Sequence, residues 1–158
     1  ASGVGSTRVL DDSDMESLDR IKYCPVMFQE QIPGSTLRVH IVGDKMVLAL
    51  KIISEGGVDS RTETRGFEPY VMPDSEAEKI VRANRFLGLH YAAWDIIVTC
   101  HGRYVYLDCN PGPFVMWIGP ERRRFVFEQL GKYMVAYSKT GSIRHASEKV
   151  SVYGEGRI

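Results

Sequence analysis

The stretch that decides the fold is WDIIVTCHGRYVYLDCN, Trp94–Asn110, in which apolar and aromatic residues fill two arms around His101-Gly102. An X-Gly dipeptide between two such arms is typical of a tight β-hairpin. The two arms are therefore expected to pair as neighbouring antiparallel strands, and the polar residues within them are the first candidates for a functional site.

The register of this hairpin predicts which polar residues meet. A two-residue turn pairs Cys100 with Arg103, and the same register sets Asp95 directly opposite Asp108. Asn110 lies two residues further along the same face, because side chains alternate along a strand. Directly opposed residues have Cβ atoms about 4.5–5.5 Å apart, where like charges destabilise a sheet. Mg²⁺ would remove that penalty, since it binds one or two carboxylates plus substrate phosphates. The pattern predicts a nucleotide–magnesium site on the hairpin.

A plainer interpretation stays open for the same residues. Asp95 could be a charge on an edge strand, and Asp108 and Asn110 could form a solvated strand end. However, Asp95 lies between apolar neighbours, where an unpaired charge is costly. We therefore favour a shared role as metal ligands for Asp95, Asp108 and Asn110. Cys109 is expected to point to the opposite face as a small apolar residue.

Composition limits the possible classes of function. The 158 residues suffice for about one domain with a sizeable core. Lys+Arg and Asp+Glu number 20 each, so no basic surface indicates a nucleic-acid or membrane partner. There is no apolar run of membrane-spanning length and no secretory signal pattern. The three cysteines lack metal-knuckle spacing, and we expect a reducing, cytoplasmic setting. The oligomeric state is not indicated.

Periodicity and capping patterns predict the remaining elements. Strands are expected at Thr7–Leu10, Val26–Gln29, Leu37–Val42 and Met46–Ile53, and helices over 13–20, 75–87 and 121–137. The first two helices are expected to open with capping boxes at Ser13-x-x-Glu16 and Ser75-x-x-Glu78. The glycine-rich residues 54–66 are expected to form a loop. Residues 138–158 are expected to be a polar tail or to add a strand at Val150–Tyr153. The predicted fold is α+β, a mainly antiparallel sheet with flanking helices.

An ordered set of motifs resembles the ATP-grasp superfamily, in its ribosomal glutamate ligase and graspetide macrocyclase branches. The motifs are FQEQIPG, LRVHIVGDK, LALKI, DSR and FLGLHYAAWDIIVTCHGRYVYLDCNPGP, and the resemblance covers about residues 1–118. Enzymes of this superfamily hold ATP between two α+β lobes and activate a carboxylate as an acyl phosphate, which an amine, hydroxyl or thiol attacks. The resemblance implies that residues 1–137 are the carboxy-terminal part of an ATP-grasp domain, with glycine-rich loop, hinge and metal hairpin.

The resemblance also implies cofactors, substrates and residue roles. ATP and Mg²⁺ are the implied cofactors, and the implied substrate is a peptide or small-molecule carboxylate with an amine or hydroxyl acceptor. Cofactor-binding roles are implied for Gly3, Gly5, Gln29, Glu30, Gln31, Ile32 and Lys51. Catalytic roles are implied for Arg38 and Arg61, whose planar guanidinium groups suit a two-pronged grip on a phosphoryl group. The plainer alternatives are a flexible terminus, an ordinary strand end and solvated charges.

The chain departs from the family pattern in three places. Asp108 stands where the family has Glu, and Thr36 stands where the family often has an acidic residue for the ribose hydroxyls. The family's phosphate-binding lysine lies on a strand before the glycine-rich loop, and no residue precedes Ala1 here. We therefore expect a fragment of a larger ligase, which binds Mg–ATP weakly and is inactive alone.

Two other functions compete with the ligase hypothesis. A non-catalytic, ATP-grasp-like nucleotide-binding or scaffold domain would account for the departures at Thr36 and Asp108. A β-rich partner-binding domain without nucleotide is disfavoured, because it gives no reason for the joint presence of four residues, Arg38, Arg61, Asp95 and Asn110.

Overall fold

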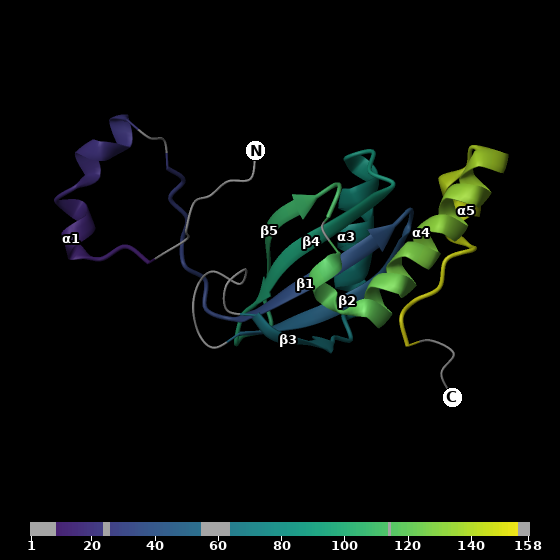
Figure 1. Cartoon of the computed structure of the whole chain (residues 1–158), viewed down its shortest axis with the longest axis horizontal. Coiled ribbons are helices and arrows are strands. Elements are labelled where there is room, and N and C mark those ends of the chain that lie inside the picture. Colours follow the sequence, from purple (N-terminus) through teal and green to yellow (C-terminus); the bar gives the residue numbers. More distant parts are fainter. Residues whose placement is uncertain (1–8, 24–25, 55–63, 114, 155–158) are drawn as a thin grey trace.

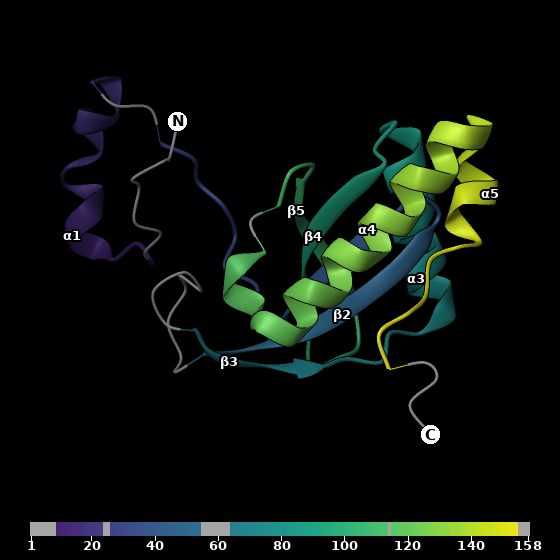
Figure 2. The same cartoon turned by 45° about the vertical axis from the view of Figure 1, so that its right-hand side comes forward.

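The computed structural model describes residues 9–23, 26–54, 64–113 and 115–154. Its centre is an antiparallel sheet of five strands in the order β3-β2-β1-β4-β5 (Figure 1). The strands are β1 Ser35–Val42, β2 Lys45–Ser54, β3 Thr64–Pro69, β4 Tyr91–Val98 and β5 Tyr104–Asn110. Helix α3 (Asp74–Phe86) covers one face and α4 (Pro120–Thr140) covers the other, and α5 (Ile143–Ser147) packs beside the end of α4 (Figures 1 and 2). The predicted α+β class is confirmed.

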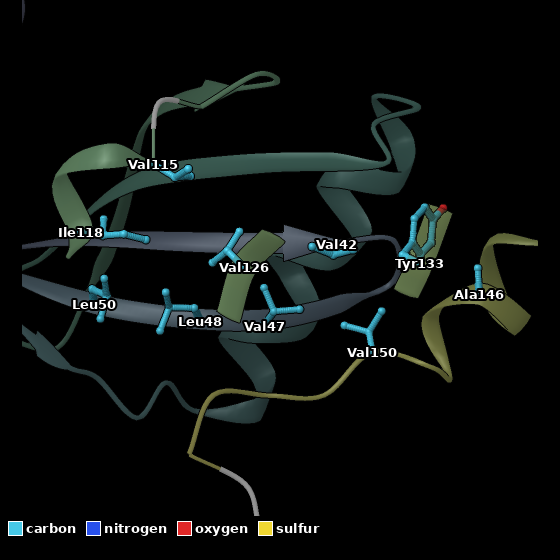
Figure 3. Packing of buried hydrophobic residues seen from close by; sticks show 10 residues of the cluster. All are labelled: Val42, Val47, Leu48, Leu50, Val115, Ile118, Val126, Tyr133, Ala146 and Val150. Carbon is cyan, nitrogen blue, oxygen red and sulfur yellow. The ribbon is translucent and has the colours of Figure 1, made fainter. Parts of the chain in front are cut away.

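The central strands bury side chains on both faces of the sheet. Successive residues of β1 alternate, so that Leu37, Val39 and Ile41 pack under α3, while Val42 packs under α4. The cluster under α3 comprises Leu37, Val39, Ile41, Ala49, Met72, Ile80, Ala92, Trp94 and Ile96. Figure 3 shows the cluster under α4 and α5, which comprises Val42, Val47, Leu48, Leu50, Val115, Ile118, Val126, Tyr133, Ala146 and Val150. This two-sided burial explains the nearly unbroken apolar runs of β1 and β2.

The β1–β2 hairpin forms as predicted, around Gly43-Asp44. Gly43 has a φ of 59°, in the left-handed region that glycine adopts readily, and its N–H donates to the carbonyl of His90 at 2.8 Å. The N–H of Asp44 donates to the hydroxyl of Ser147 at 2.8 Å, which joins the turn to α5. The turn is therefore held between β4 and the C-terminal helices.

The N-terminal helix differs from the prediction. Instead of one helix over 13–20, the structure has α1 (Asp12–Met15) and a 3-10 helix (Leu18–Lys22). The capping box lies two residues earlier than expected, because the Asp11 side chain accepts from the backbone of Ser13 and Asp14. Figures 1 and 2 show α1 to one side of the sheet.

The strands predicted before β1 are wrong where the structure describes them. Residues 26–34 run without regular structure, and Met27 is 86% exposed. Val9 and Leu10 are likewise outside any strand, whereas Thr7 and Arg8 lie outside the described residues. Among the described residues, the edge strands β3 and β5 pair only with β2 and β4, so neither edge of the sheet takes up these segments.

Strand β3 begins within residues that were predicted to form a loop. Residues 55–63 lie outside the described part, but Thr64–Pro69 pairs antiparallel with β2, with Phe67 opposite Ile52. Phe67 is the one large apolar residue among polar ones in this strand, so period-two alternation is absent from the sequence. An edge strand with little burial carries little hydrophobic signal.

Helix α3 forms over the predicted residues without the predicted cap. It begins at Asp74 after Pro73, and no side chain caps its first turn, so the Ser75–Glu78 box is absent. Gly88, with a φ of 68°, follows its end as predicted. Proline fixes its own φ and ends the preceding extended segment, so the helix begins directly after it.

The C-terminal segment is neither a polar tail nor an added strand. Helix α4 continues to Thr140, α5 follows, and Val150 packs into the cluster under both helices. The N–H of Tyr153 then donates to the carbonyl of Val47 at 2.8 Å, without forming a strand. Together these contacts tie the segment to the sheet.

Two residues of α4 have an exposure opposite to what their polarity suggests. Met134 is 61% exposed, whereas Gln129 is buried and accepts from the N–H of Ser151 at 2.9 Å. The polar contact with the following segment explains why a glutamine occupies a core position. No helix within the described ranges is both long and apolar enough to cross a membrane.

Candidate functional site

The hairpin of β4 and β5 brings the three predicted metal ligands together. Asp95 pairs directly with Asp108, and Asn110 pairs with Ala93, so the three polar side chains share one face. The Nδ2 of Asn110 donates to Oδ2 of Asp95 at 3.2 Å and to Oδ2 of Asp108 at 3.0 Å. Cys109 packs in the cluster under α3, on the opposite face, as predicted. The three residues form what we call the acidic cluster.

The turn that produces this register differs from the predicted one. The N–H of Thr99 donates to the carbonyl of Arg103 at 2.9 Å, so Cys100, His101 and Gly102 form a three-residue connection. Gly102 has a φ of 74°, as the last residue of such loops usually requires. A three-residue loop by itself shifts the register by one residue from the predicted pairing.

A β-bulge at Leu107 restores the predicted register. Asp95 pairs with Asp108 but Ile96 pairs with Tyr106, which leaves Leu107 as the extra residue. The bulge also reverses the faces: the hydroxyl of Tyr106 donates to Glu76 of α3 at 2.9 Å, whereas Asp108 faces away from α3. Without the bulge, Tyr106 and Asp108 would share a face, since they are two residues apart.

Arg38 is the cation of this site. It pairs across the sheet with Asp95, and its Nη1 lies 2.7 Å from both carboxylate oxygens. The guanidinium group also lies over the ring of Trp117, 5.5 Å from its centroid. Sequence reasoning missed Trp117, because no local pattern places the segment after β5 over β1. The Nε of Arg38 is buried and has no hydrogen-bond partner among the described residues.

The acidic cluster is not fully neutralised by this arginine. Burial raises the pKa of the Asp95 carboxyl group, the positive charge of Arg38 offsets this only in part, and Asp108 raises it further. Asp108 itself is exposed, and it accepts a hydrogen bond from the amide group of Asn110. The two carboxylates together therefore carry more negative charge than the single guanidinium group of Arg38 can offset.

The donor set has the chemistry of a hard-cation site that is completed by another ligand. Two carboxylates and one amide oxygen are too few for an all-protein cage, and no group of three or more His, Cys, Asp or Glu side chains gathers elsewhere in the described part. Mg²⁺ is usually held by one or two carboxylates, with phosphate oxygens and water completing its shell. The cluster fits that pattern.

The other predicted site residues do not gather at the acidic cluster in the described part of the chain. Gln29, Glu30 and Gln31 are exposed and Ile32 is half-buried, in the segment that leads into β1. That segment enters the sheet beside the end of β4, since Ser35 pairs with Val98. Arg61, Gly3 and Gly5 lie outside the described residues.

Lys51 is not brought to the acidic cluster. It pairs with Leu37 on β1 and with Glu68 on β3, and Leu37 belongs to the cluster under α3. Paired residues share a face, so Lys51 lies on the opposite face from Arg38 and Asp95. Its position on the return strand of the hairpin was predicted, but the resemblance alone did not specify its face.

His40 sits beside the site as a buried neutral base. It is 0% exposed, its Nδ1 lies 3.2 Å from the hydroxyl of Tyr91, and its Nε2 has no partner in the described part. Burial, aided by the positive charge of Arg38, lowers the pKa of His40 from 6.5 to about 3. His40 is therefore a packed residue and not a proton carrier near neutral pH.

This depressed pKa predicts a loss of stability in acid. Between about pH 6.5 and pH 3 the unfolded chain binds a proton at His40 that the folded chain does not, so the free energy of unfolding falls as the pH falls. Each pH unit in that window costs up to about 1.4 kcal/mol. In urea unfolding at pH 7 and pH 5, we expect His40→Gln to reduce the pH dependence of the free energy of unfolding. The control His101→Gln, at an exposed histidine, is expected to retain that dependence. Equal slopes for both variants would contradict this assignment.

The sequence was compared with family models and with curated proteins. No family model matches the sequence. A curated relative from Hahella chejuensis, "Probable alpha-L-glutamate ligase 1", is 30% identical over 115 residues, which cover 70% of this chain and 37% of the relative. The match therefore spans most of this chain but only a minor part of the relative.

Two solved structures share the fold. ATP-grasp ligase PsnB, complexed with a phosphomimetic variant of its minimal precursor, Mg and ADP, is 30% identical with a TM-score of 0.65, over 73% of this chain and 38% of that chain. Macrocyclase MdnC from Microcystis aeruginosa MRC, bound with precursor peptide MdnA, is 27% identical with a TM-score of 0.58, over 73% of this chain and 37% of that one. This chain thus spans well under half the length of the proteins it matches.

Proposed function

The chain belongs to the ATP-grasp superfamily, and on this premise we propose that it supplies the magnesium–nucleotide site of an ATP-dependent carboxylate–amine or carboxylate–hydroxyl ligase. The observation that carries the proposal is the acidic cluster of Asp95, Asp108 and Asn110, set against Arg38 on one face of the sheet. The names of the similar proteins support the ligase class.

In this proposal the acidic cluster holds the metal of Mg–ATP. Asp95 and Asp108 bind through carboxylate oxygens, and Asn110 turns its amide oxygen toward the ion in place of the nitrogen that now contacts both carboxylates. Held there, Mg²⁺ would supply positive charge beside the phosphates during phosphoryl transfer. Aspartate at position 108 reaches one methylene less far than the glutamate that the family has there, which favours a single ion.

The proposed reaction has two steps. A substrate carboxylate oxygen attacks the γ-phosphorus of ATP, the bond to the bridging oxygen breaks, and ADP leaves. An amine or hydroxyl then attacks the acyl carbon, loses its proton to a base, and displaces inorganic phosphate. Arg38 and Arg61 would stabilise the charge on the transferring group, a role that for Arg61 stays a prediction from the resemblance.

The proposed substrate is a glutamate or peptide carboxylate. The curated relative is named a glutamate ligase, and the two solved neighbours are complexes with precursor peptides or variants of them. We also propose that the adenine binds to the backbone of the segment that leads into β1 beside the end of β4. This segment comprises Gln29, Glu30, Gln31 and Ile32. The cytoplasmic setting predicted from the sequence stays a prediction.

A non-catalytic nucleotide-binding domain is the second candidate. It is favoured by the ion pair of Arg38 with both oxygens of Asp95, which gives the carboxylate a partner without any metal. The aspartate at position 108 and Thr36 point the same way, as departures from the family pattern.

Hydroxylamine trapping distinguishes the two candidates. The protein expressed from its native open reading frame is incubated with Mg–ATP, hydroxylamine and either L-glutamate or a glutamate-rich peptide. A ligase that forms an acyl phosphate yields a hydroxamate and an equal amount of ADP, and Asp95→Asn abolishes both. Binding of Mg–AMPPNP without hydroxamate from either substrate would favour the scaffold. Absence of nucleotide binding would contradict both candidates.

A further inference from the structure

We infer that Arg38 is a resident counterion that keeps divalent cations off Asp95 until a nucleotide is present. The inference rests on the proposed function of the acidic cluster as a magnesium–nucleotide site. It assigns to Arg38 a gating role for the metal in addition to any contact with phosphate, and it makes metal binding depend on the nucleotide.

Both oxygens of the Asp95 carboxylate already accept hydrogen bonds. Its two oxygens each lie 2.7 Å from Nη1 of Arg38, and Oδ2 also accepts from Nδ2 of Asn110 at 3.2 Å. The side chains of Arg38 and Asp95 are 7% and 26% exposed, so water screens their interaction poorly. A divalent cation at Asp95 would stand beside the guanidinium group and be repelled by it. A free metal ion therefore competes with Arg38 for the same oxygens.

The guanidinium group has a donor left over for an anion. The Nε of Arg38 is buried without an acceptor among the residues that the structure describes, although a buried donor without a partner is unfavourable. The face of the group rests on Trp117, which holds it in plane without using a hydrogen-bond donor. A phosphate oxygen would satisfy Nε and compensate the positive charge.

Nucleotide and metal are therefore expected to bind with positive coupling. With phosphate oxygens as partners for Arg38, the Asp95 carboxylate would become available, and the acidic cluster would then hold the metal of the nucleotide. Because coupling between two ligands is reciprocal, the metal must strengthen nucleotide binding by the same factor. The expected factor is about 5- to 150-fold, the usual span for coupled sites.

The test counts free Mn²⁺ by electron paramagnetic resonance, with Mn²⁺ as the probe for Mg²⁺. The 158-residue chain is titrated with and without AMPPNP, beside Arg38→Met and the control Arg122→Met. Arg122 is a half-buried arginine that donates to the carbonyl groups of Ile118 and Phe67 and not to the acidic cluster. Each variant is first checked for a cooperative thermal transition.

The wild-type chain and Arg122→Met are expected to bind Mn²⁺ about 5- to 150-fold more tightly with AMPPNP than without it. Arg38→Met is expected to bind nucleotide-free Mn²⁺ more tightly than the wild type, with most of the enhancement by AMPPNP lost. Equal Mn²⁺ affinity of the wild type with and without AMPPNP would overturn the inference, even if Arg38→Met fails to fold. So would an unchanged nucleotide-free affinity in a folded Arg38→Met. No binding of Mn–AMPPNP at all would instead overturn the proposed function.

Discussion

Asp108→Asn is expected to weaken binding of Mg–AMPPNP by at least about 10- to 100-fold, the loss typical for removing even an outer partner of a metal site. The same change is expected to leave the thermal midpoint of the metal-free protein unchanged or slightly raised. The reason is that Asp108 directly opposes Asp95 across the ladder, where like charges destabilise a sheet. Because this carboxylate destabilises the metal-free fold, we infer that its role is to bind a ligand.

Calorimetry with AMPPNP, with and without Mg²⁺, measures the first effect, and circular dichroism on heating measures the second. Asp19→Asn is the matched control, because Asp19 lies in the 3-10 helix, its side chain is 95% exposed, and it pairs only weakly with Lys22 at 3.9 Å. Magnesium-dependent binding that survives in Asp108→Asn, or unfolding of its apo form, would show that the carboxylate has a structural role instead.

Gly43→Ala is expected to lower the free energy of unfolding by about 2–5 kcal/mol. About 1–2 kcal/mol comes from placing an L residue at a φ of 59°. A further 1–3 kcal/mol, roughly, comes from overpacking, because the new Cβ would collide with the Ser147 hydroxyl and the Tyr133 ring. Both contacts come from the C-terminal helices, so the prediction also tests how closely these helices press on the turn.

Gly102→Ala is the matched control for this substitution. Gly102 has a comparable φ of 74°, but a Cβ there would meet nothing within 4 Å. Only the backbone cost of about 1–2 kcal/mol is expected. Urea unfolding of both variants beside the wild type measures the difference. Equal destabilisation by the two changes would mean that the C-terminal helices do not pack on the Gly43 turn as described.

The hairpin that carries the acidic cluster could be predicted from sequence because its signals are local. The apolar and aromatic arms around His101-Gly102 indicated two paired strands, and Asp95 does face Asp108. The prediction reached this pairing through a two-residue turn, whereas the structure combines a three-residue loop with a bulge at Leu107. The bulge could not be predicted, because no turn or capping signal in the sequence marks the one extra residue.

The partner of Asp95 could not be predicted in the same way. The pairing of Arg38 with Asp95 depends on β1 lying beside β4, and 57 positions of sequence separate the two residues. Family resemblance pointed Arg38 toward phosphates and supplied no information about its contacts in the absence of nucleotide. For the same reason it placed Lys51 near ATP without revealing that this lysine faces the α3 side of the sheet.

The errors at the two ends of the chain have opposite causes. Before β1, the apolar residues Val26, Met27 and Phe28 suggested a buried strand, but they are 55%, 86% and 55% exposed and pair with no described strand. After α4, a polar composition suggested a tail, but Ala146 and Val150 pack into the core cluster, and Tyr153 donates a hydrogen bond to β2. Local composition measures the tendency to be buried, whereas burial also requires a surface to pack against.

Paramagnetic broadening by Mn²⁺ tests the central claim most directly, that the acidic cluster holds the metal of a bound nucleotide. Amide spectra of the ¹⁵N-labelled chain are recorded with AMPPNP and a small fraction of Mn²⁺, because broadening falls steeply with distance from the ion. The account predicts that the signals of Asp95, Asp108 and Asn110 disappear first, that those of α5 persist, and that Asp108→Asn prevents the loss. Broadening centred elsewhere, or identical broadening in Asp108→Asn, would contradict it.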